Sequence, residues 1–136
     1  MQPDISAAQT EPDDEVANLR WSAWMPLMAA HPLALAQLPS EPGIYRIRRA
    51  GRPDRLVWIG WEPRGVRETV ERLSRQVHMP IEPFDDPRNP ARLLWNMRRQ
   101  EGIGFEVSGA PVGGETASGS ALVATLRAHY GLLRSK

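Results

Sequence analysis

The side chains that could do chemistry in this 136-residue chain gather in its middle, where a tyrosine and a series of arginines surround two short apolar runs. Arginine binds phosphate through a planar fork of N–H donors, so a row of arginines predicts salt-sensitive contacts with phosphates. The candidates for such contacts are Arg46, Arg48, Arg64, Arg67, Arg72 and Arg75. A second interpretation is coding bias, because a genome rich in G and C favours arginine, and Lys136 is the sole lysine.

Charge is divided unevenly along the chain, although the formal net charge is only +1. Residues 1–42 hold six acidic groups and one basic group, whereas residues 43–136 hold sixteen basic groups and ten acidic ones. A basic body suits an anionic partner. The acidic leader, residues 1–18, is predicted to be disordered, and its charge could equally serve only to keep the protein soluble.

Composition excludes several classes of site and location. There is no cysteine, which rules out disulfides, thiolate metal sites and a cysteine nucleophile. The length fits one domain with a single core. No signal peptide is visible, and the longest apolar region, residues 24–38, contains two prolines and is too short to cross a bilayer. These features predict a cytoplasmic protein with no membrane partner.

The elements that must position the arginines form a small α+β domain over residues 43–136, with an N-terminal extension, residues 19–42, packing on its core. Alternation and apolar runs predict strands, and apolar residues spaced three or four apart predict helices. The predicted order is strand 43–49, strand 56–60, helix 64–77, helix 91–101, strand 105–108 and helix 120–130. This order predicts a three-stranded antiparallel sheet flanked by helices.

Two of these segments carry finer detail. In the first strand, Ile44 and Arg46 are expected on one face of the sheet, and Tyr45 with Ile47 on the other. The helix over residues 91–101 should begin after an asparagine and a proline and end at a glycine.

These motifs, in this order, resemble the GIY-YIG nuclease superfamily. The resemblance covers residues 42–130 and is carried by GIY at 43–45, WIG at 58–60, the arginine-bearing helix and the passage LLWNMRRQEGIGFEVS. It implies the family's fold and a metal-dependent cut of a phosphodiester bond. In that reaction two tyrosines activate water, an arginine on the first helix steadies the phosphate, and a glutamate on the last helix holds Mg²⁺ or Mn²⁺.

Transferred position by position, the resemblance is incomplete. Tyr45 matches the first tyrosine, but Trp58 stands at the second, and an indole can only donate a hydrogen bond. The family's arginine aligns with Thr69, so Arg72, one turn further along, and Arg67 are the two alternatives. His78 has the type and place of a histidine that often follows this helix. It is a candidate for nucleic-acid binding, with a structural role as the alternative.

The last position of the family pattern bears on the metal. Val123 stands where the metal-binding glutamate belongs, and the sequence holds no acid from Thr116 to the C-terminus. Asp85 and Asp86 resemble a metal pair, but two acids before a proline more often form a turn. We therefore expect no metal site, with Mg²⁺ or Mn²⁺ as a cofactor only if the protein is catalytically active.

Three functions follow from these residues, and fold alone does not choose among them. The favoured one is a catalytically degenerate domain, a pseudoenzyme, that binds nucleic acid, with DNA the preferred form, and does not cut it. The first alternative is an active metal-dependent DNA endonuclease that uses Tyr45 with Arg72 or Arg67. The second is a protein-interaction module anchored by Trp21, Trp24 and Trp61.

Overall fold

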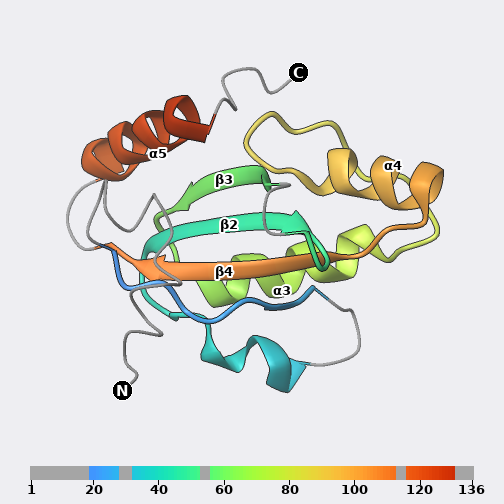
Figure 1. Cartoon of the computed structure of the whole chain (residues 1–136), viewed down its shortest axis with the longest axis horizontal. Helices are drawn as coiled ribbons and strands as arrows, with labels where there is room; N and C mark the ends of the chain where they lie inside the picture. The colour runs from blue at the N-terminus through green and yellow to red at the C-terminus, as the bar shows by residue number, and fades with distance from the viewer. Residues whose placement is uncertain (1–18, 28–31, 53–55, 113–115, 131–136) are drawn as a thin grey trace.

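The computed structural model describes residues 19–27, 32–52, 56–112 and 116–130 (Figure 1). The predicted disordered leader lies outside these residues. Within them, no helix combines the length and the apolar character that a membrane span requires.

A four-stranded antiparallel sheet forms the centre of the domain, with strand order β1-β4-β2-β3. Its strands are β1 (Met25–Pro26), β2 (Gly43–Arg49), β3 (Leu56–Glu62) and β4 (Phe105–Pro111). The α+β class is confirmed, but the predicted number of three strands is wrong. The additional strand, β1, belongs to the N-terminal extension and pairs with the outer edge of β4.

The edge strand β1 is short because its two residues do not favour a strand by themselves. Pro26 lacks an N–H, which confines proline to the edges of sheets. Pairing with β4 extends beyond the two strand residues, since the amide of Leu27 donates to the Phe105 carbonyl at 3.0 Å and that of Ser22 to the Gly109 carbonyl at 2.8 Å. The extension is thus held by hydrogen bonds to a strand about eighty residues away in the chain.

The described helices are a 3-10 helix, η1 (Pro32–Gln37), and the α-helices α3 (Val66–Val77), α4 (Ala91–Glu101) and α5 (Thr116–Tyr130). α4 has its predicted bounds. The Asn89 side chain accepts a hydrogen bond from the Ala91 amide at 2.8 Å, and Gly102 ends the helix in the left-handed conformation. α5 begins four residues before the predicted start.

The two faces of the sheet carry different cores. Tyr45 and Ile47 belong to a core shared with Val66, Val70 and other residues of α3, as the alternation along β2 predicts. Ile44 and Ile59 belong to a second core with Val123 and Leu126 of α5. Figure 1 shows α3 below the sheet and α5 beside the other side of β3. A residue at the β3 edge can therefore reach side chains from both helices.

Candidate functional site

A pocket of about 570 Å³ lies where β2, β3, α3 and α5 meet. Its lining includes the positions that the resemblance to the nuclease superfamily singles out, apart from Arg67 and His78. These residues are Tyr45, Trp58, Thr69, Arg72 and Val123. Residues from four separate elements are thus brought to one place.

Gly60 explains how Tyr45 and Trp58 come to share one wall of the pocket. Tyr45 on β2 is directly opposite Gly60 on β3, and Trp58 precedes Gly60 by two residues and so points to the same face. A Cβ at Gly60 would lie 2.8 Å from Trp58 Nε1 and 2.9 Å from the Tyr45 ring. Only glycine leaves room for the phenol and the indole to meet over this point.

The phenol of Tyr45 is held in its neutral form. Tyr45 is only 3% exposed, and burial raises its pKa above the usual value for tyrosine. A general base needs a pKa near the working pH, so the free protein does not present Tyr45 as a ready base.

Four arginines line the pocket, namely Arg64, Arg72, Arg88 and Arg127. Arg64 and Arg72 are exposed, and neither side chain forms an ion pair with any residue that the structure describes. Arg88 lies 3.7 Å from a carboxylate oxygen of Asp86. Arg64 and Arg72 therefore offer the pocket cationic groups that no acid among the described residues pairs with.

Arg127 approaches the pocket from α5 and is fixed against the edge strand. Its Nε and Nη2 atoms donate to the Ile59 carbonyl at 3.1 and 2.8 Å, and its guanidinium lies 4.5 Å from the centre of a Trp58 ring. The carbonyl is available because β3 is an outer strand of the sheet. Partial burial lowers the pKa of Arg127, which nonetheless stays charged because arginine starts so high.

Buried hydrogen-bond donors in the pocket wall make no bond to the described part of the protein. They are Trp61 Nε1 and Thr69 Oγ1. Both atoms are enclosed in the wall and present almost no accessible surface to the pocket.

The two acids of the pocket are engaged in shaping its loops. A Glu62 carboxylate oxygen accepts the Arg64 amide hydrogen at 3.0 Å, and Asp86 accepts that of Arg88 at 3.0 Å. Asp86 is therefore a turn former, as expected, while Asp85 lies 3.5 Å from Arg92.

The chemistry of the lining does not fit the metal that the resemblance implies. Val123 presents only methyl groups at the position of the glutamate, and no cluster of three potential ligands occurs among the described residues. Hard divalent cations need several oxygen ligands. No hydrolytic step through a metal follows from this pocket.

Three of the predicted phosphate-contacting residues on or next to α3 lie outside this pocket. Arg67 donates through Nε to the Leu38 carbonyl at 3.0 Å, which ties α3 to the segment before β2. Arg75 is exposed on α3. His78 donates through Nδ1 to the Ser74 carbonyl at 2.8 Å, since a carbonyl can only accept.

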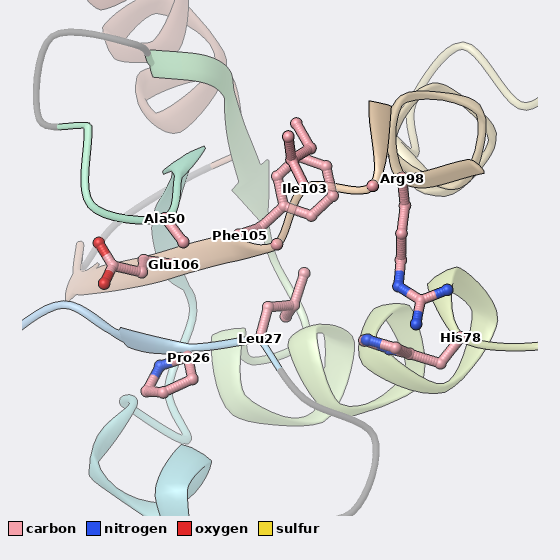
Figure 2. A pocket seen from close by; sticks show the side chains of 10 residues that line it. Pro26, Leu27, Ala50, His78, Arg98, Ile103, Phe105 and Glu106 are labelled. Atoms are coloured by element: carbon pink, nitrogen blue, oxygen red, sulfur yellow. The ribbon is translucent and has the colours of Figure 1, made fainter. Parts of the chain in front are cut away.

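His78 instead lines a second pocket, at the far ends of α3 and α4 (Figure 2). There its ring and the Arg98 guanidinium point toward each other, while Leu27 and Phe105 form an apolar wall. Arg98 lies in the last turn of α4, where the helix dipole favours a positive charge, and His78 directly follows the last turn of α3.

Arg46 and Arg48 lie on the opposite face of the sheet from Tyr45. Arg46 is only 3% exposed, with its guanidinium 4.0 Å from the ring centre of Trp21 and 4.5 Å from that of Trp24. Arg48 stacks on Trp24 at 4.1 Å and pairs with Glu106 at 2.7 Å. We refer to these four residues, Trp21, Trp24, Arg46 and Arg48, as the stacked layer.

The stacked layer contains residues for which two roles are predicted, phosphate contact for its arginines and protein interaction for its tryptophans. Its arginines are occupied within the protein, and its tryptophans cover them. Trp61, the third tryptophan considered as an interaction anchor, packs against Gly119 of α5. All three therefore make contacts within the protein.

Sequence reasoning missed two of the four arginines of the pocket, Arg88 and Arg127. A signal for Arg127 was present, because it follows Val123 by four residues and so shares its side of a helix. The sequence carries no comparable signal for Arg88, which reaches the pocket from the loop before α4.

No protein-family model, curated protein or solved structure matches the chain. The resemblance to GIY-YIG nucleases accordingly stays a prediction from the sequence motifs.

Proposed function

We propose that this protein binds nucleic acid through the pocket around Tyr45 and does not cut it. The observation that carries the proposal is the lining: four arginines line one hollow, against two acids that are engaged in loops. Phosphate oxygens accept hydrogen bonds and carry negative charge, so a nucleic-acid backbone complements this lining.

Two features argue against a cutting reaction. Tyr45 is kept neutral by burial, and the place for a metal ligand on α5 is taken by Val123. Without an activated water or a Lewis acid, the arginines stabilise a bound phosphodiester but supply no nucleophile.

The test is binding and cleavage of labelled single-stranded, duplex and branched DNA, and of RNA, with Mg²⁺, with Mn²⁺ and with a chelator. We expect binding that weakens as salt rises and no product in any condition. Metal-dependent cleavage that disappears in Tyr45→Phe would contradict the proposal and establish the endonuclease.

A matched pair of variants ties the binding to the pocket. Arg72 and Arg75 lie one turn apart on α3 and are both exposed, but only Arg72 lines the pocket. Arg72→Gln should weaken binding about tenfold and reduce the salt dependence by about one phosphate contact. Arg75→Gln should have a much smaller effect, and equal losses would place the binding surface elsewhere.

A further inference from the structure

α5 delivers a cation to the pocket at the point where the related nucleases deliver a carboxylate. Val123 and Arg127 lie one helical turn apart and both line the pocket. We propose that Arg127 replaces the missing metal ion: together with Arg72 it holds a phosphate group of the ligand, and this binding needs no divalent cation. The inference deepens the proposed function and rests on it for the identity of the ligand.

The guanidinium of Arg127 has N–H donors that its bonds to Ile59 do not use, and its orientation is fixed. Arginine carries five N–H donors, and two of those in Arg127 are used by the Ile59 carbonyl. The remaining three are available to phosphate oxygens. Because the carbonyl and the Trp58 ring already hold the side chain, little conformational entropy is lost when a ligand binds.

Two departures from the family pattern, Trp58 and Val123, both favour a phosphate-binding role for Arg127. Trp58 takes the place of a tyrosine and provides the aromatic face on which the guanidinium stacks. A glutamate at position 123 would be an i,i+4 neighbour of Arg127, and such pairs attract one another on a helix. Valine at 123 therefore leaves the remaining donors of Arg127 uncommitted, whereas a metal-binding acid would neutralise them.

A purely structural role for Arg127 makes a different prediction. If Arg127 only links α5 to β3, its substitution lowers stability and leaves ligand binding by the folded protein unchanged. The experiment must therefore measure binding below the unfolding transition of each variant and include a change that leaves the bonds of Arg127 to Ile59 in place.

The experiment measures oligonucleotide affinity by fluorescence anisotropy in chelator and in Mg²⁺. Wild-type affinity should be the same in both. Arg127→Gln should bind about tenfold more weakly in chelator, whereas Arg98→Gln, with the same loss of charge in the second pocket, should bind normally. Wild-type binding that requires Mg²⁺, or unchanged affinity in Arg127→Gln, would overturn the inference.

A second variant keeps the test decisive if Arg127→Gln does not fold. Val123→Glu places a carboxylate beside Arg127, so affinity in chelator should fall and Mg²⁺ should restore part of it. Val123→Gln introduces a side chain of the same shape as glutamate but without its charge, and it should show neither effect. Equal behaviour of the two variants counts against a phosphate at Arg127.

Titration with inorganic phosphate separates this inference from the proposed function. The indole N–H of Trp58, followed by NMR in chelator, should shift on phosphate addition in wild type and not in Arg127→Gln. If no nucleic acid binds but this shift is present, the proposed function fails and the metal-free phosphate site stands. If nucleic acid binds and phosphate leaves both proteins unshifted, the site at Arg127 is refuted and the binding function survives.

Discussion

Arginine lies against tryptophan on both faces of the sheet, besides a contact between Arg99 and Trp95 on α4. In the stacked layer, Arg46 is buried against Trp21 and Trp24, and Arg48 is paired with Glu106. In the pocket, Arg127 also lies on a tryptophan, but its neighbours Arg64 and Arg72 are exposed and have no ion pair among the described residues. The same residue types are therefore used for packing on one face and exposed in a pocket on the other.

The difference shows that burial and pairing, and not residue type, decide what an arginine can bind. A guanidinium enclosed by two rings stabilises the fold through its contacts and has little surface left for a ligand. An exposed guanidinium contributes little to stability but can meet an incoming phosphate. Substitutions on the two faces should accordingly separate stability from binding.

Removing Arg46 should produce the largest loss of stability. Arg46→Ala leaves the Trp21 and Trp24 rings without the group between them, and we expect the free energy of unfolding to fall by about 3 kcal/mol. Urea denaturation measures the change. Arg72→Ala is the comparison in the pocket and should stay within about 0.5 kcal/mol of wild type. The reverse order of effects would mean that the two faces have been assigned wrongly.

Gly60→Ala tests the close approach of Tyr45 and Trp58 and should have the next largest effect. The added Cβ would lie within 3 Å of both rings, so one of them must move. We expect a loss of about 2 kcal/mol in the free energy of unfolding, typical of overpacking. Gly104→Ala is the control, because its Cβ would have no neighbour closer than 3.9 Å. Similar losses at both positions would show that the crowding at Gly60 is relieved without cost.

Much of the fold could be predicted because the relevant signals are local. The bounds of β2 and α4 were predicted correctly, since alternation, an asparagine start and a glycine stop all lie within the segments themselves. The strand β1 could not be predicted. Two residues that include a proline have no strand pattern of their own, and they pair only because β4 presents an open edge.

The candidate site, too, could be predicted only in part. The resemblance supplied Tyr45, Trp58, Arg72 and Val123, and these meet in one pocket. Nothing in the local sequence distinguishes the buried Arg46 from the exposed Arg72, because both are arginines beside apolar residues. Arg46 is covered by Trp21 and Trp24, which come from a segment outside the family pattern. Arg72 lies in a pocket beside β3, an outer strand of the sheet.

The buried phenol in the pocket predicts a pH dependence of stability. Burial raises the pKa of Tyr45 in the folded protein, so the folded state holds its proton at a pH where the unfolded chain has lost it. The stabilisation is complete below the usual tyrosine pKa of about 10 and is lost as pH rises above it, by at most about 1.4 kcal/mol per pH unit. Urea titrations between neutral pH and pH 11 measure this decline. Tyr45→Phe should flatten it, and an unchanged slope would mean that other groups cause the decline.

The smallest effect we predict is the coupling between Trp58 and Arg127. A double-mutant cycle of Trp58→Leu and Arg127→Met should give about 0.5 to 1 kcal/mol of coupling in the free energy of unfolding. Trp95 and Arg99, whose groups lie 5.0 Å apart on α4, form the control cycle. Because they are neighbours on an exposed helix face, their coupling should be a few tenths of a kcal/mol.

The same cycle, measured in the free energy of oligonucleotide binding, decides whether the two faces of the sheet really differ. If Trp58 orients Arg127 toward a phosphate, each single variant weakens binding and the double variant weakens it little further. Coupling in stability without coupling in binding would make Arg127 a packing residue like Arg46. The pocket would then depend on Arg64, Arg72 and Arg88, and α5 would close the site without contacting the ligand.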